Sequence, residues 1–114
     1  GSALLTGVVV ARKDVVEENP AAIDAFLADY AQSVEWVNAN TADAAALIGD
    51  YGIVDAAVAE KALPACNIVC ITGAEMKEKL SGYLQVLFEE DPSSVGAQAG
   101  DDAGLPGDDF YYGA

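Results

Sequence analysis

Apolar side chains recur at the spacing of an α-helix over residues 20–39, and this periodicity constrains the fold more than any other feature. Asn19 followed by Pro20 is a typical helix start, with the Asn at the N-cap and the Pro in the first turn. A long amphipathic helix is therefore predicted here, with these residues on its inward face: Ile23, Phe26, Leu27, Tyr30, Val34 and Val37.

Three further helices are predicted, over residues 41–51, 55–63 and 73–90. Each follows a residue that can cap a helix, and each ends at a Gly or Pro signal: Thr41 to Gly52, Asp55 to Pro64, and Thr72 to Asp91-Pro92. The last helix begins with a capping box, Thr72-Gly-Ala-Glu75, in which both side chains are expected to bond to backbone N–H groups. Their predicted inward residues are Ala44, Leu47, Ile48 and Tyr51, then Val58, Ala59, Ala62 and Leu63, then Met76, Leu80, Tyr83, Leu84 and Leu87.

Two short stretches have the character of extended chain. Residues 5–11 are rich in β-branched side chains and predict a buried strand that Arg12-Lys13-Asp14 ends, and residues 67–71 predict a second extended segment. The fold class expected is therefore mainly α, about four helices plus one or two short strands. The length suits one compact unit, since domains commonly have about 100–150 residues.

The chain is strongly acidic. It carries 5 Lys and Arg against 19 Asp and Glu, a net charge of −14. Nucleic acid and anionic membrane surfaces are therefore not expected partners, because both require clustered cations. No apolar run approaches the roughly 20 residues that span a bilayer, so a soluble molecule is expected. Gly1-Ser2-Ala3 is interpreted as a cloning remnant, so the lack of a signal peptide carries no information about location.

No catalytic, metal or cofactor site is predicted. The chain has no histidine, which excludes Ser-His-Asp and Cys-His catalysis, and it has no glycine-rich phosphate loop. Two acidic clusters are interpreted as solvated charges at helix ends rather than as paired catalytic carboxylates: Glu17-Glu18 and Glu89-Glu90-Asp91. Four tail aspartates lack the spacing of an EF-hand, and an acidic linker is favoured over a calcium site: Asp101, Asp102, Asp108 and Asp109.

Cys66 and Cys70 are predicted to be free, half-buried thiols. Zinc is not expected, because a structural site needs four Cys or His ligands. A disulfide needs Cα atoms within about 7 Å, and four extended residues span about 13 Å.

Four aromatic residues are expected to pack in the core, with a ligand-binding wall as the alternative: Tyr30, Trp36, Tyr51 and Tyr83. Arg12 is assigned a surface or capping role. The tail, residues 93–114, is rich in Gly, Asp, Ala and Pro, and only Leu105 and Phe110-Tyr111-Tyr112 are expected to anchor it on the helices.

One part of the sequence stands out for the order of its segments: the run from Ile68 to Pro92, then Ser93-Ser-Val-Gly96, then Phe110-Tyr-Tyr112. The run includes Ile71-Thr-Gly-Ala-Glu-Met76. Together with three earlier segments, this part resembles the C-terminal part of solute-binding proteins of ABC importers, in the branch of thiamine-precursor, nitrate and sulfonate binders. Those segments are Val8-Val-Val-Ala-Arg-Lys-Asp14, Glu18-Asn-Pro20 and Phe26-Leu-Ala-Asp-Tyr-Ala-Gln-Ser33. The resemblance covers residues 8–96 and 110–112 and rests on order and spacing. The tail departs from it, being longer between Gly96 and Leu105.

The resemblance implies a periplasmic-binding-protein fold, in which two α/β lobes close on a solute without transforming it. Residues 4–92 would be the helical closing part of one lobe, and most of the pocket would lie outside this chain. The implied partners are a small solute and an ABC permease, and the implied location is extracytoplasmic. The chain is not expected to bind solute alone, and neither the solute nor its contact residues are identified.

Two other function classes stay open at this point: a freestanding helical protein-interaction domain and, less favoured, an enzyme fragment. An upstream signal sequence, a lipid-anchor Cys and a long βα pattern would favour the binding protein. An apolar strand at residues 4–11 without sheet neighbours also predicts a dimer or higher oligomer, because unpaired edges pair with other copies.

Overall fold

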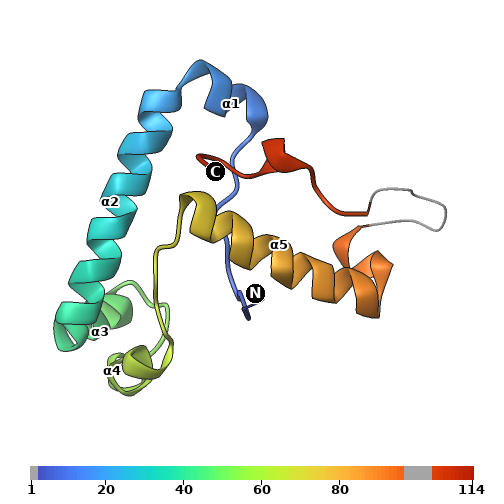
Figure 1. Ribbon diagram of the computed structural model, residues 1–114. Coiled ribbons are helices and arrows are strands. Elements are labelled where there is room, and N and C mark those ends of the chain that lie inside the picture. The colour runs from blue at the N-terminus through green and yellow to red at the C-terminus, as the bar shows by residue number, and fades with distance from the viewer. Residues whose placement is uncertain (1–2, 97–103) are drawn as a thin grey trace. The chain divides into compact units, whose positions relative to one another are not determined.

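The computed structural model describes residues 3–96 and 104–114. Within these residues the chain is helical and contains no strand. The α-helices are α1 (Lys13–Glu18), α2 (Pro20–Ala39), α3 (Thr41–Asp50), α4 (Ala56–Ala62) and α5 (Gly73–Glu90), as Figure 1 shows. Short 3₁₀ turns lie at η1 (Leu63–Ala65), η2 (Pro92–Val95) and η3 (Asp108–Phe110).

The contacts divide the chain into two units rather than the one compact unit expected from its length. The α1–α4 unit comprises residues 11–70, and the α5 unit comprises residues 1–10 and 71–114. Few residues are buried in either unit, and many large apolar side chains are exposed instead.

The core of the α1–α4 unit consists of small side chains at the contact between α3 and α4. Ala44, Ala45 and Ala59 are buried together with Leu63, and Val37, Ile48 and Ile68 pack against them. Gly49 of α3 lies so close to α4 that a Cβ added to it would meet the Cβ of Ala56 at 2.9 Å. Alanine and glycine therefore allow the two helices to approach closely.

The predicted burial of the aromatic residues is wrong for three of the four. Tyr51 is 80% exposed, Trp36 42% and Tyr30 40%, and only Tyr83, on α5, is half-buried as a core residue would be. Leu47 and Val58, predicted to face inward, are likewise exposed. A contact built from alanine leaves no room for large side chains between α3 and α4, so Leu47, Tyr51 and Val58 lie outside it.

The predicted bounds of α2 and α5 are confirmed, and those of α3 and α4 are confirmed to within a residue. Asp55 caps α4 as predicted, since its Oδ1 accepts a hydrogen bond from the Ala57 N–H at 2.9 Å. Gly52 ends the turn after α3 with a φ of +71°, a conformation that costs glycine little.

Three predicted side-chain cap hydrogen bonds do not form. Asn40, rather than Thr41, occupies the N-cap of α3, and its side chain instead donates to the Trp36 carbonyl at the end of α2. Asn19 holds the N-cap position of α2, as predicted, but makes no side-chain cap bond. The Thr72 capping box is wrong as well: Thr72 makes no cap bond. Its partner Glu75 pairs with Lys79 one turn along at 3.7 Å.

The strand predicted at residues 5–11 and the extended segment at 67–71 contain no strand pairing in the described structure. A strand exists only when its backbone groups pair with a neighbour, and neither segment pairs with the other. The sequence pattern also fails to predict α1, because Lys13–Glu18 resembles the end of a strand followed by the start signal of α2. The mainly α prediction is therefore confirmed for the described residues, and the one or two short strands predicted among them are wrong.

Candidate functional site

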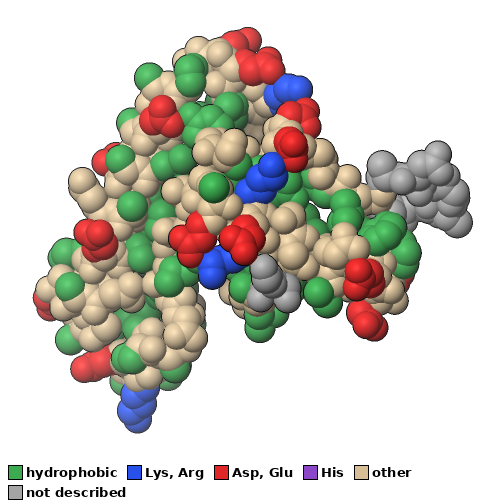
Figure 2. Space-filling view, in the orientation of Figure 1, with side chains coloured by type: hydrophobic (Ala, Val, Ile, Leu, Met, Phe, Trp, Pro, Cys, Tyr) green, Lys and Arg blue, Asp and Glu red, His purple; other side chains and the backbone are tan. Residues whose placement is uncertain are grey.

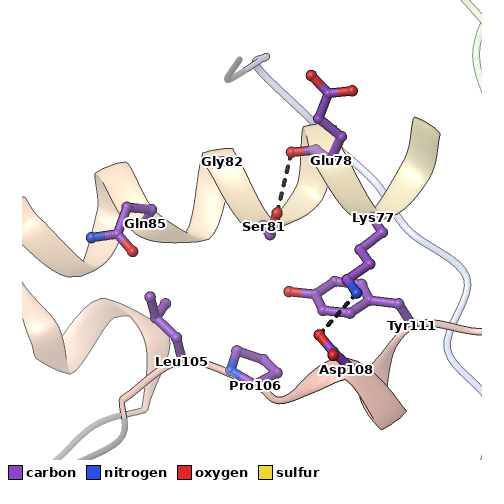
Figure 3. A pocket seen from close by; sticks show the side chains of 9 residues that line it. All are labelled: Lys77, Glu78, Ser81, Gly82, Gln85, Leu105, Pro106, Asp108 and Tyr111. Atoms are coloured by element: carbon purple, nitrogen blue, oxygen red, sulfur yellow. Dashed lines mark hydrogen bonds and ion pairs between the residues drawn. The ribbon is translucent and has the colours of Figure 1, made fainter. Parts of the chain in front are cut away.

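A shallow groove in the α5 unit lies between α5 and the C-terminal segment, residues 104–114. Its volume is about 620 Å³. Five residues of α5 line one side, and four residues of the C-terminal segment line the other: Lys77, Glu78, Ser81, Gly82 and Gln85, then Leu105, Pro106, Asp108 and Tyr111. Figure 3 shows Lys77 reaching from α5 toward Asp108 beside the ring of Tyr111.

The C-terminal segment is anchored to α5 mainly by Tyr111. This residue is 7% exposed, whereas the neighbouring Phe110, whose ring meets it edge to face at 5.2 Å, is 56% exposed. Leu105 is half-buried, and the carbonyl of Gly113 lies 3.5 Å from where a Cβ on Gly73 would be. The prediction that Leu105 and the terminal aromatics anchor the tail is confirmed for Leu105 and Tyr111.

An ion pair adds a second attachment. Lys77 Nζ lies 2.8 Å from Asp108 Oδ1. The hydrogen bond from Lys77, and then its positive charge, lower the pKa of Asp108. Because the Asp108 side chain is 93% exposed, solvent screens the pair, so it orients the segment more than it stabilises it.

The groove offers little chemistry. Lys77 is the one cation among its lining residues, and Asp108 neutralises it. The Ser81 hydroxyl donates to the Glu78 carbonyl at 3.2 Å, and the Gln85 amide donates to Glu89 at 2.8 Å. The polar groups are therefore engaged within the chain, and the arrangement serves to hold the C-terminal segment.

The acidic clusters singled out in the sequence lie at helix ends. Glu17 and Glu18 end α1 and are exposed, and Glu89 and Glu90 end α5 and are exposed. Asp91 caps η2, and hydrogen bonds from the hydroxyl and then the N–H of Ser93 lower its pKa.

The tail aspartates are divided between described and undescribed parts of the chain. Asp108 and Asp109 lie in η3, whereas Asp101 and Asp102 lie outside the described residues. The residues that the structure describes contain no group of three or more His, Cys, Asp or Glu side chains arranged to hold a metal ion.

Both cysteines are free, as predicted, although Cys66 is exposed and only Cys70 is half-buried.

Arg12 takes the surface role assigned to it: it lies at the N-cap position of α1 and pairs with Asp14 at 2.7 Å. Sequence analysis did not single out Lys77 as a residue that pairs with the tail.

Comparison of the chain with protein-family models, with curated proteins and with solved structures gave no match. No helix among the described residues has the length and apolar character needed to cross a membrane.

Proposed function

We propose that this chain is part of an extracytoplasmic solute-binding protein, which captures a small solute and delivers it to an ABC permease. The proposal assigns residues 4–92 to the helical C-terminal part of one lobe and the aromatic ending to a segment that closes over α5. The chain alone would not bind solute, because most of the pocket would come from other residues of the parent.

The observation that carries the proposal is the N-terminal segment of the α5 unit. Leu4 is 78% exposed, and Val8, Val9 and Val10 are 61%, 56% and 80% exposed. An exposed β-branched run suits a strand whose sheet neighbours are supplied by other residues, as a parallel sheet of an α/β lobe would do.

The docked tail supports the same proposal. The resemblance rests in part on the order of α5, the Asp91-Pro92 stop and the terminal Phe110-Tyr111-Tyr112. Tyr111 is buried within the α5 unit although a long polar tail separates it from α5 in sequence. A fixed position for this ending agrees with an element that closes a lobe.

The test is to join this chain to the upstream residues of its reading frame and to screen thiamine precursors, nitrate and aliphatic sulfonates by thermal shift. Ligand binding to the folded state raises stability by RT ln(1 + [L]/Kd), about 2.7 kcal/mol at a hundredfold excess over Kd. For a domain of this size we expect an increase in Tm of several degrees. The chain by itself should show none. A saturable shift with this chain alone, or an upstream region without a signal sequence and βα pattern, would contradict the proposal.

A freestanding protein-interaction domain is the second candidate, and the exposed aromatic side chains of α2 favour it. An upstream start codon near Ala3, together with no solute in a broad screen of the extended protein, would support this interpretation instead.

A further inference from the structure

One face of α2 carries a strip of partly exposed aromatic side chains. We define the α2 strip as Phe26, Asp29, Tyr30, Ser33 and Trp36. These residues are three and four positions apart, so they are neighbours along one side of the helix. From Phe26 to Trp36 the strip covers ten residues, or about 15 Å at the helical rise.

The aromatic side chains of the strip are open to solvent. Phe26 is 48% exposed, Tyr30 40% and Trp36 42%. The Phe26 and Tyr30 rings contact each other at a centroid distance of 5.9 Å, which fixes them as a pair. Within the α1–α4 unit, α2 packs against α1 and α3.

Helix α2 carries charge of one sign only. Helix α2 contains no Lys or Arg, and Asp29 lies between the Phe26 pair and Trp36. From residue 14 to residue 60 the sequence has no basic residue at all and carries these acids: Asp14, Glu17, Glu18, Asp24, Asp29, Glu35, Asp43, Asp50, Asp55 and Glu60. Figure 2 shows red and green side chains, and no blue, along α2.

The aromatic side chains and the negative charge together indicate what kind of partner fits the α2 strip. A second copy would bring an equal set of negative charges, and membranes and nucleic acids are anionic as well. A cationic partner is attracted instead, and aromatic faces bind Arg and Lys through cation–π contacts. Because a straight ridge of side chains on one helix packs best against another helix, the fitting partner is a helix with apolar and basic residues.

We propose that the α2 strip docks a cationic amphipathic helix of another protein. Phe26, Tyr30 and Trp36 supply the apolar and cation–π contacts, and Asp29 pairs with an Arg of the partner. This inference does not rest on the proposed transport function, and its test uses no solute.

Trp36 is the single tryptophan of the chain, so its fluorescence reports directly on the strip. The probe is a synthetic helical peptide with leucine on one face and arginine on the other, titrated into the whole chain. We expect a saturable blue shift of the Trp36 emission. Raising the salt concentration to about 0.5 M should weaken binding, since the Debye length is then only a few ångströms.

Variants then separate the strip from general charge attraction. Asp29→Asn and Phe26→Ala should each weaken binding at least fivefold, with the helix content checked by circular dichroism. The matched control is Glu60→Gln, which removes the same charge from an exposed position on α4 and should change affinity less than twofold.

Four results of the binding experiments would overturn the proposal. They are no shift up to millimolar peptide, equal binding of a scrambled peptide of the same composition, equal weakening by Glu60→Gln, and binding to anionic vesicles instead of the peptide. Concentration-dependent self-association that changes the Trp36 emission without peptide would identify a second copy as the occupant, and would overturn it as well.

Discussion

The α1–α4 unit and the α5 unit bury their apolar side chains in different ways. In the first, adjacent helices α3 and α4 meet through alanines and a single leucine, so the contact is close but contains few large groups. In the second, one helix is covered by a segment distant in sequence, and a single aromatic side chain, Tyr111, is buried.

This difference has a consequence for function. A contact between small side chains contributes little stability. The larger apolar side chains then stay on the surface, where a partner could contact them, as on α2. In the α5 unit, Tyr111 holds the C-terminal segment against α5. The part of α5 under this segment is covered, and the groove is the open surface beside it. The α1–α4 unit is therefore the better candidate for binding another protein, and the α5 unit for holding a closing segment in place.

The largest expected effect is that of removing Leu63, the one large side chain that is buried in the core at the α3–α4 contact. Leu63→Ala should lower the free energy of unfolding of the α1–α4 unit by about 2–4 kcal/mol, because it creates a cavity that alanine neighbours cannot fill. Urea unfolding followed by NMR signals of individual residues measures it. Val58→Ala is the control on the same segment, since Val58 is 57% exposed. Equal losses for the two variants would show that Leu63 does not form the core.

The next largest effect is expected in the α5 unit alone. Tyr111→Ala should release the C-terminal segment from α5 and cost about 1.5–3 kcal/mol of burial in the α5 unit. We expect the NMR signals of Lys77 and Ser81 to shift and those of Ala44 and Ala59 to change far less.

Phe110→Ala provides the control for the tail, because Phe110 is mostly exposed and its removal should leave the segment docked. Loss of docking in both variants would mean that the aromatic pair, rather than Tyr111 alone, is the anchor.

A smaller effect is expected at the cap of α4. Asp55→Ala removes the hydrogen bond to the Ala57 N–H and should destabilise the α1–α4 unit by about 1 kcal/mol. Thr72→Ala should cost much less in the α5 unit, because Thr72 makes no side-chain cap bond. Comparable losses at the two sites, measured by thermal unfolding, would show that the Thr72 capping box does form in solution.

These residues also show how far sequence analysis reaches. The bounds of α2 and α5 followed from apolar spacing and from Pro20, Asp91 and Pro92, because those signals act within a few residues. The predicted burial of Tyr51 and Trp36 is wrong, since periodicity marks an apolar face without specifying what covers it. The strand at residues 5–11 fails for the same reason: pairing depends on a neighbour elsewhere in the sequence.

The groove in the α5 unit was predictable only in part. Leu105 and Tyr111 stand out as apolar residues in a polar tail, so their docking could be expected. The ion pair between Lys77 and Asp108 could not be predicted, because no local pattern in the sequence determines which of the tail aspartates contacts α5.

The smallest expected effect is a dependence of tail docking on pH. The pKa of Asp108 is lowered in the folded chain by the hydrogen bond and charge of Lys77. Such a carboxylate contributes stability above its unfolded pKa of about 3.9, and this contribution is lost as the pH falls through the lower folded value. Docking of Tyr111, followed by NMR, should therefore weaken slightly below about pH 4 and also with added salt.

Asp108→Asn should remove this part of the pH dependence while leaving Tyr111 docked at neutral pH. Asp91 has a lowered pKa as well, through Ser93, so Asp91→Asn is the needed comparison: it should alter η2 and leave the Tyr111 signal unchanged. If Tyr111 keeps the same acid response in Asp108→Asn, the ion pair does not guide the tail, and its attachment rests on burial of the aromatic ring alone.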